Sequence, residues 1–318
     1  MNTQNTELLS QIFSGVHCQL SNDFGLIRAT GEDARSFLHS QLTQDILHLS
    51  ADEVRLAGYC SAKGRMYAVS YVWLSDDAVY LLTHRSVIDT VIKRLRMFVL
   101  RAKVVLEDVS AQFAITGYIG ADALPNQVKQ TDEKTTRLGI LPASLTEWQQ
   151  ADAPREIRIT PLAQFEAVEF AAPQLWSWLD IMAGVAHVRA EISEAFVPQM
   201  MNLDRIGGVN FKKGCYPGQE IVARSHYLGK LKRRMQAASM VVEPAPALVV
   251  GMDVYSTIDE REPAGQLLAF APNPLVAQRW DVLYEVSLPM LAEGAQIYLK
   301  DMAAQWQSRP LPYLLQDA

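Results

Sequence analysis

The chain has 318 residues, enough for two or three domains, and its 49% hydrophobic and 20% charged residues are typical of a folded globular protein. This composition excludes a disordered or fibrous chain. With 29 basic and 35 acidic residues the formal net charge is −6, which also excludes a uniformly positive surface for nucleic acids.

The three cysteines, Cys18, Cys60 and Cys215, are few and widely spaced, which argues against a disulfide framework and fits a reducing cytoplasm. The first 16 residues lack the basic start and apolar core of a signal peptide. No stretch approaches the roughly 18 apolar residues that a membrane span requires. We therefore expect a cytoplasmic protein without membrane contact.

Strand patterns dominate the first third of the chain. Apolar residues alternate in four stretches, at 16–28, 53–60, 66–73 and 78–82. This alternation predicts a β-meander. Helical spacing predicts a short helix that includes Phe37 and Gln41, and an amphipathic helix over 86–100. Strand patterns return at 102–107 and 111–119.

The rest of the chain divides into three parts. Residues 120–155 are polar and turn-rich without periodicity, which predicts a loosely packed connection or a small helix with an edge strand. Residues 172–188 have helical spacing, with Pro173 near the start and Gly184 at the end. After about residue 236, short strands separated by proline or glycine predict a small antiparallel barrel or sandwich.

The segment from Lys212 to Arg234 is unusually basic. It holds seven lysines or arginines and one acid, Glu220, so its net charge is 7 − 1 = +6 although the whole chain is negative. This distribution points to a local anion site. The alternative is an ordinary solvated charged face.

Cys215 lies in this basic segment, after Lys213 and Gly214 and just before a predicted helix, QEIVARS. Cationic neighbours and a helix N-terminus favour the thiolate, which is the nucleophilic form of cysteine. The setting predicts a reactive cysteine, and the alternative is a buried, inert one. Cys18 and Cys60 lie in strand patterns, so we expect them to pack inertly in the core.

Four other side chains allow two interpretations each. Gln219 and Glu220 could point an amide and a carboxylate into a cleft, or could be ordinary residues of a first helical turn. Trp176 and Trp178 point in very different directions on a helix, so at most one faces a given cavity. Core packing is the expectation for each tryptophan.

Several common sites are missing from the sequence. There is no GxGxxG after a strand, no GxxxxGK[ST] and no GxSxG, which excludes the usual dinucleotide, P-loop and nucleophile-elbow sites. The six histidines form no HExxH, and no CxxC occurs. We therefore expect no permanent protein-bound metal.

The run 213–220, KGCYPGQE, resembles the KGCYxGQE signature of the folate-binding YgfZ family. That family is related in fold to the aminomethyltransferase, or T-protein, of the glycine cleavage system. The resemblance extends from about residue 20 to the C-terminal PLPYLL. Further positions fit the family's pattern: Phe196, Pro198, Gln199, Asn202, Leu203, Gly207, Gly208 and Phe211, and near the N-terminus Gly31, Asp33, Ala34, Phe37, Gln41, Thr43 and Asp45.

The resemblance implies an α+β fold arranged as a three-part ring, as in the glycine cleavage T-protein. An N-terminal α+β region would span 1–110. A ferredoxin-like middle part with the KGCYPGQE run would span 111–235, and a C-terminal antiparallel β-barrel 236–318. The ring would surround a central channel that binds tetrahydrofolate or another reduced folate.

The resemblance also implies a function. The chain would be a cytoplasmic, tetrahydrofolate-binding accessory protein that supports maturation or repair of iron–sulfur enzymes and thereby tRNA modification. Its partners would be folate and iron–sulfur enzymes such as those that thiolate tRNA. Cys215 and Lys213 would be the catalytic residues. The thiol would accept a one-carbon unit, a persulfide or a transient cluster iron, and these alternatives stay open.

A set of seven residues is expected to contact the folate. Phe24 and Trp176 match two tryptophans to which folate contacts are assigned in bacterial relatives. A flat pterin needs an aromatic face and amide or carboxylate partners, and the anionic tail of a folate needs cations. The expected set is Phe24, Trp176, Asn202, Tyr216, Gln219, Glu220 and Arg224.

Two alternative functions remain. One is a folate-dependent one-carbon transferase or demethylase, which is weakened because Ser61 and Met182 stand where relatives often have carboxylates. The other is direct tRNA binding by the basic segment, which we do not expect because few aromatic residues are interleaved with its cations. The cations concerned are Lys230, Lys232, Arg233 and Arg234.

Overall fold

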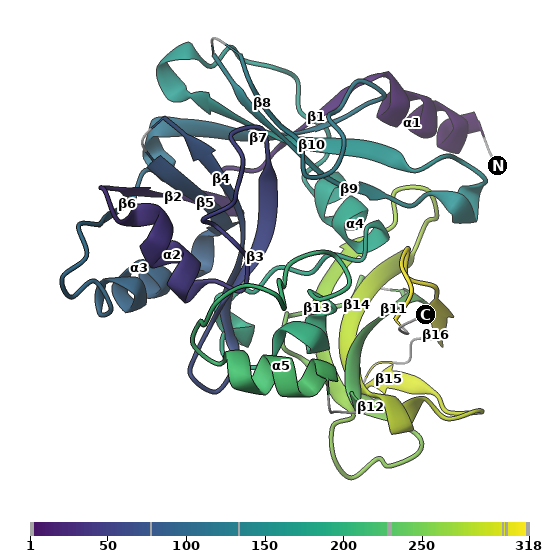
Figure 1. The fold of residues 1–318 in the computed structure, drawn as a ribbon. Helices are drawn as coiled ribbons and strands as arrows, with labels where there is room; N and C mark the ends of the chain where they lie inside the picture. Colours follow the sequence, from purple (N-terminus) through teal and green to yellow (C-terminus); the bar gives the residue numbers. More distant parts are fainter. Residues whose placement is uncertain are drawn as a thin grey trace.

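The computed structural model describes residues 3–76, 78–132, 134–227, 231–243, 245–300, 302 and 305–315. Its framework is three antiparallel sheets (Figure 1). In Figure 1 the sheets surround the green segment that connects α4 to α5. The α+β fold that the resemblance implied is therefore confirmed.

The first sheet has the strand order β3-β4-β5-β2-β6. Two helices, α2 and α3, pack on one face of this sheet and share a core with it. The hairpins β3–β4 and β4–β5 confirm the predicted meander over 53–82. The bounds are β2 Phe24–Thr30, α2 Ala34–Gln41, β3 Val54–Cys60, β4 Met66–Ser75, β5 Ala78–His84, α3 Ile88–Arg96 and β6 Val105–Asp108.

The second sheet has the order β1-β7-β10-β9-β8, and helices α1 and α4 lie beside it. The alternating stretch 16–28 is split between two sheets, because β1 pairs with β7 while β2 joins the first sheet. The bounds are α1 Thr3–Ser14, β1 Val16–Gln19, β7 Phe113–Ile119, β8 Lys129–Thr131, β9 Thr136–Ala143, β10 Ala153–Pro161 and α4 Gln174–Met182.

The expectation of a loosely packed connection over 120–155 is wrong. Strand β9 lies inside the second sheet, between β10 and β8, and its Leu138 and Ile140 are buried. Only β8 matches the expected edge strand. Strand β9 could not be recognised in the sequence because few of its eight residues are both apolar and buried. The alternation of apolar and polar residues is therefore too short to detect.

The third sheet has the order β15-β12-β13-β14-β11-β16 and curls, with its two edge strands approaching each other. The predicted C-terminal barrel is therefore confirmed as a curled antiparallel sheet (Figure 1). The bounds are β11 Arg233–Val241, β12 Asp253–Ser256, β13 Gly265–Pro272, β14 Arg279–Ser287, β15 Ile297–Leu299 and β16 Gln305–Arg309.

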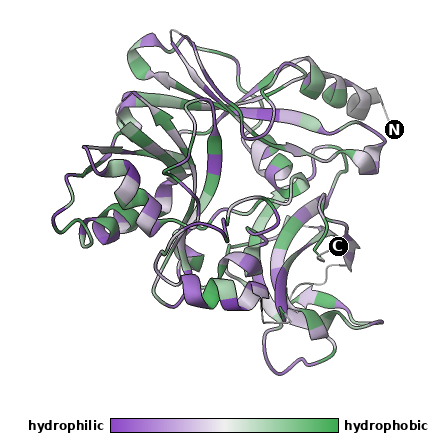
Figure 2. Ribbon diagram, viewed as in Figure 1, coloured by the Kyte–Doolittle hydropathy of each residue, from purple (hydrophilic) through white to green (hydrophobic). Residues whose placement is uncertain are grey.

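The predicted helices over 172–188 and at QEIVARS are present as α4, which ends before Gly184 at φ +65°, and α5, Gln219–Tyr227. In Figure 2 α5 carries both hydrophobic and hydrophilic residues, and its buried side chain is Val222. Short 3₁₀ turns complete the fold: η1 Arg85–Val87, η2 Ser110–Gln112, η3 Thr146–Trp148, η4 Leu162–Gln164, η5 Ala190–Ile192, η6 Pro198–Met201 and η7 Leu288–Leu291.

One hydrophobic cluster joins all three sheets. It includes Leu26 of the first sheet, Ile157 of the second and Leu283 of the third, together with most of α4. The three parts therefore share a core, and α4 lies where they meet. Among the described residues no helix is long and apolar enough to cross a membrane.

Candidate functional site

The run 213–220, here named the Cys segment, packs against the hairpin between β3 and β4. Gly218 has φ +78°, and a Cβ there would lie 2.4 Å from the carbonyl oxygen of Ser61. Only glycine adopts this backbone shape at such a close approach without strain. Gly218 therefore fixes how the Cys segment packs against the hairpin.

Lys213 ties the Cys segment to the C-terminus of α2. Its Nζ donates hydrogen bonds to the carbonyl oxygens of His39 and Leu42, the latter at 2.7 Å. Carbonyls at a helix C-terminus lack partners within the helix, so a lysine is well suited there. Burial lowers the pKa of Lys213 to about 8, against the opposing effect of Asp45.

The three thiols differ in exposure. Cys215 is exposed, whereas Cys18 and Cys60 are buried in the core. Burial raises the pKa of Cys18 and of Cys60 to about 12 in each case. At neutral pH those two cysteines stay as inert thiols, and Cys215 is the cysteine that an external reagent or ligand can reach.

The other residues of the predicted site near Cys215 lie on the Cys segment and α5. Tyr216 is buried, with its ring centre 5.0 Å from the Nζ of Lys213. Gln219 and Glu220 are the first two residues of α5, half-buried and exposed respectively. Arg224 is exposed one turn further along the helix. These residues are near neighbours in the sequence, so they also lie near one another in the structure.

The basic segment is less positive than its sequence suggested. Arg233 forms an ion pair with Glu285, and Arg234 pairs with Asp204 at 2.6 Å. The side chain of Glu285 is fully buried and that of Asp204 is 3% exposed. These two cations therefore form internal contacts of β11 and are not free to bind an external anion. Lys230 lies outside the described residues.

The remaining three predicted folate residues are buried on other elements. Asn202 donates to the carbonyl of Met235 at 2.9 Å and has no exposure. Trp176 lies in the core, where a Cβ on Gly117 would come within 2.3 Å of its ring. Phe24, at the start of β2, is buried with its ring edge-on to His187 at 4.8 Å between centroids.

A chain of contacts links Trp176 to Phe24. The guanidinium of Arg155 lies 5.0 Å from the centre of the Trp176 ring and donates to Asp180 at 2.8 Å. The second carboxylate oxygen of Asp180 lies 3.5 Å from Nε2 of His187, which touches Phe24. The two aromatic residues therefore flank one buried polar cluster, made of Arg155, Asp180 and His187.

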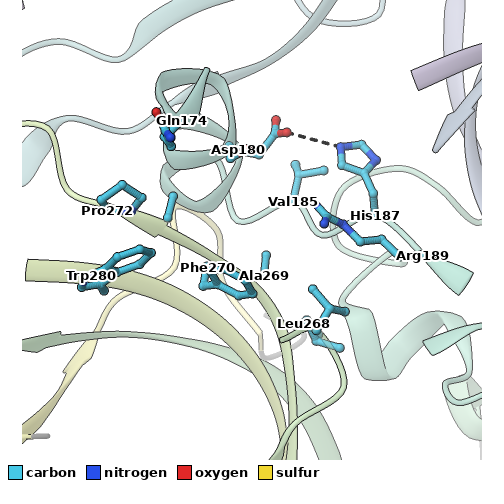
Figure 3. A pocket seen from close by; sticks show the side chains of 13 residues that line it. Gln174, Asp180, Val185, His187, Arg189, Leu268, Ala269, Phe270, Pro272 and Trp280 are labelled. Carbon is cyan, nitrogen blue, oxygen red and sulfur yellow. Dashed lines mark ion pairs between the residues drawn. The ribbon is translucent and has the colours of Figure 1, made fainter. Parts of the chain in front are cut away.

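A cavity of about 340 Å³ opens beside this cluster, between α4 and the third sheet (Figure 3). In Figure 3 Asp180 and His187 face each other along one wall, and strands of the third sheet form the opposite side. Neither Phe24 nor Trp176 lines it. The lining residues are Gln174, Ser177, Asp180, Val185, His187, Arg189, Val250, Leu268, Ala269, Phe270, Ala271, Pro272 and Trp280.

The charges in the cavity wall are set by burial and by their neighbours. Burial opposes ionisation of Asp180, but Arg155 and His187 together hold the pKa of this carboxyl below its ordinary value. Nearby, burial followed by the charges of Arg189 and His187 lowers the pKa of His84 to about 3. Asp180 is therefore a carboxylate at neutral pH, and His84 is neutral.

Sequence reasoning missed the residues of this wall. Asp180 is the only charged residue in the apolar helix QLWSWLDIM, which is a signal that an attentive inspection of α4 would find. His187 and Arg189 follow the helix in an irregular segment and give no such signal. Among the described residues, no group of three His, Cys, Asp or Glu side chains is arranged to hold a metal ion.

The fold as a whole is similar to that of a known aminomethyltransferase. Glycine cleavage system aminomethyltransferase T from Bartonella henselae superposes with a TM-score of 0.69, covering 98% of this chain and 89% of that one, at 14% sequence identity. The chain therefore has the three-part fold of the T-protein class, as expected.

The sequence relatives narrow the class to one family. tRNA-modifying protein YgfZ of Vibrio vulnificus strain YJ016 is 30% identical over 94% of this chain and 92% of its own length. The protein of the same name from Aliivibrio fischeri strain MJ11 is 29% identical over 93% and 92%. No protein-family model matches the chain. At this identity and coverage, the chain belongs to the YgfZ family.

Proposed function

We propose that the chain is a folate-binding accessory protein that supports iron–sulfur enzymes and, through them, tRNA modification. The observation that carries the proposal is the exposed Cys215 within the KGCYPGQE run of a YgfZ family member. The names of the relatives support the link to tRNA modification. We infer a cytoplasmic site of action, which three free cysteines favour.

The cavity beside α4 fits a reduced folate chemically. Its volume is at the lower end of the range for small-molecule sites, and the ring faces of Phe270 and Trp280 suit a flat pterin. The Asp180 carboxylate suits the N–H groups of a pterin edge. Arg189 is half-buried, has no ion-pair partner among the described residues, and suits the carboxylates of the tail.

A titration of tetrahydrofolate, followed by tryptophan fluorescence, tests this assignment because Trp280 lines the cavity. Wild type should bind, and Arg189→Met should bind about tenfold more weakly, since a charge-assisted hydrogen bond is lost. Arg261→Met is the matched control, because Arg261 is exposed in the loop between β12 and β13. Equal affinities of the three proteins for tetrahydrofolate would show that the folate does not bind in this cavity.

The role of Cys215 is tested in a strain that lacks the gene. Wild type should restore thiolated nucleosides in tRNA, measured by mass spectrometry, and Cys215→Ala should not. Cys18→Ala, which removes a buried thiol, is the control and should restore them. Full restoration by Cys215→Ala would show that the thiol has no chemical role.

The second candidate function is a folate-dependent one-carbon transferase. The observation that favours it is Asp180, a buried carboxylate in the cavity of a T-protein fold, although Ser61 and Met182 are not acids. The test is incubation with tetrahydrofolate and aminomethyl or N-methyl donors. Formation of methylene-tetrahydrofolate would support this candidate, and its absence despite measurable folate binding would support the accessory role.

A further inference from the structure

Three aromatic rings meet at the C-terminal end of α5. Phe211, which lies two residues before the Cys segment, stacks on His226 with 3.8 Å between the ring centres and 12° between the ring planes. Tyr227 stands edge-on to both rings, 6.1 Å from Phe211 and 4.8 Å from His226. Tyr227 is nevertheless 64% exposed. A tyrosine that is supported by its neighbours and open to solvent offers a ligand a flat apolar face.

Exposed cations lie next to these rings. Lys212 follows Phe211 directly in the chain and is exposed. Arg224 is also exposed and lies three residues before Tyr227 on α5, so these two side chains are neighbours on the helix surface. Neither cation forms an ion pair with a described residue, whereas the two arginines at the start of β11 are both paired with buried acids. Lys212 and Arg224 are therefore free to bind an external anion.

The hairpin between β3 and β4 adds a third cation near the N-terminal end of α5. Gly64 packs against this helix, since a Cβ on the glycine would lie 3.1 Å from the Cβ of Ile221. The preceding residue, Lys63, is exposed and has no ion-pair partner in the part of the chain that the structure describes. The acid of α5 is Glu220, so three cations oppose one carboxylate although the whole chain is negative.

This surface, here named the α5 surface, consists of Lys63, Phe211, Lys212, Arg224, His226 and Tyr227. Positive charge beside an exposed ring suits a single strand of RNA, because its phosphates attract cations and its unpaired bases stack on aromatic side chains. An acidic peptide or a lipid headgroup would use the cations but not the ring face. A double helix keeps its bases stacked on one another. The combination of charge and ring therefore favours a single strand.

We propose that the α5 surface binds single-stranded RNA, with one base stacked on Tyr227 and the neighbouring phosphates held by Lys212 and Arg224. This reverses the expectation from the sequence, in which few aromatic residues are interleaved with the cations. Folding supplies a further ring, because it places Phe211 against α5. The chain then contacts RNA itself, which goes beyond a role exerted through iron–sulfur enzymes.

The test is fluorescence anisotropy of a labelled oligouridylate of about eight nucleotides, titrated with the full chain at about 50 to 200 mM salt. Wild type should bind, with an affinity that falls as the salt concentration rises. Tyr227→Ala should bind about tenfold more weakly because one stacked base is lost, and Tyr227→Phe should stay close to wild type. Lys212→Gln and Arg224→Gln should each reduce the slope of log affinity against log salt by about 0.7, the value for one phosphate contact with a single strand.

Matched controls come from the helical layer of the first sheet. Phe98, which follows α3, is 51% exposed, and Lys93 on α3 is also exposed. Phe98→Ala and Lys93→Gln therefore remove an exposed ring and an exposed cation elsewhere on the molecule, and both should bind the oligouridylate as wild type does. The same strand paired with oligoadenylate should bind more weakly, since its bases are already stacked. Circular dichroism checks that each variant is folded.

Each contrary outcome overturns the proposal. These outcomes are no binding by wild type at up to about 100 μM protein, Tyr227→Ala binding as tightly as wild type or no more weakly than Phe98→Ala, and unchanged salt slopes in both cation variants. Equal affinity for the duplex also overturns it, and binding to phosphatidylglycerol vesicles but not to oligouridylate would indicate a lipid partner instead. The assay contains neither folate nor an iron–sulfur enzyme, so its failure is distinct from a failure of the proposed function.

Discussion

The Cys segment and the cavity beside α4 are held by different kinds of contact. The Cys segment is anchored by backbone contacts: Lys213 binds carbonyls of α2, and Gly218 packs on the hairpin at Ser61. The cavity wall is held by buried charges, with Asp180 paired to Arg155. Backbone contacts can thus hold the Cys segment in place while its thiol stays exposed. The cavity depends instead on paired buried charges and packed rings, so we expect substitutions there to be more destabilising.

The largest effect is expected from breaking the buried pair of the cavity wall. Asp180→Ala should lower the free energy of unfolding by about 3–5 kcal/mol, because it leaves the unexposed guanidinium of Arg155 without its counter-charge. Urea unfolding measures the loss. Asp259→Ala, which removes a solvent-screened pair with Arg261, should lower the free energy of unfolding far less. Similar losses in the two variants would contradict the comparison.

Adding one methyl group to each region sharpens the contrast. Gly117→Ala should cost about 1–3 kcal/mol, since its Cβ would overlap the Trp176 ring at 2.3 Å and push against α4. Gly214→Ala should change stability by less than about 0.5 kcal/mol, because its nearest neighbour is at 3.7 Å. Thermal and urea unfolding compare the two. Equal losses would show that the Cys segment is packed as tightly as α4.

A smaller loss of stability is expected from removing the anchor of the Cys segment. Lys213→Met keeps the length of the side chain but leaves the carbonyls of His39 and Leu42 without their donor, which should cost about 1–2 kcal/mol. Lys212→Met, on the exposed neighbouring residue, is the control. If both lysine variants unfold at the same urea concentration, the anchor contributes nothing.

The smallest effect at neutral pH is expected at His84, next to the cavity wall. Burial lowers the pKa of His84 in the folded chain to about 3, below the ordinary 6.5. Between these two pH values the ring therefore binds a proton in the unfolded chain but not in the folded one. Stability from the neutral ring is therefore full above pH 6.5 and is lost as pH falls toward 3. His84→Asn can keep a bond like that of Nδ1 to Ser86 without titrating.

The measurement at His84 is the difference in Tm between pH 7.0 and pH 5.0. This difference should be smaller in His84→Asn than in wild type, and the two proteins should be close at pH 7.0. A wild-type Tm that falls no more steeply than that of the variant would mean that the ring is not held neutral.

Sequence patterns predicted most elements because their periodicity is local. The meander over 53–82 and the helix QEIVARS each follow from a short run of residues. The split of 16–28 between two sheets could not be predicted, because an alternating pattern does not specify its pairing partner. The Cys segment was found because it is contiguous. Asp180, His187 and Arg189 were missed because an irregular segment brings them together, and no periodic sequence pattern predicts its shape.

The sequence by itself determined the family, the antiparallel character of the C-terminal part and the basic, glycine-rich surroundings of Cys215, all of which are carried by neighbours in the chain. The tertiary structure alone decided that Lys213 caps α2, that Arg233 and Arg234 are neutralised by buried acids, and that Trp176 packs on Gly117. These outcomes depend on which distant groups share a buried space, where an unpaired charge or an overlapping atom is too costly to persist.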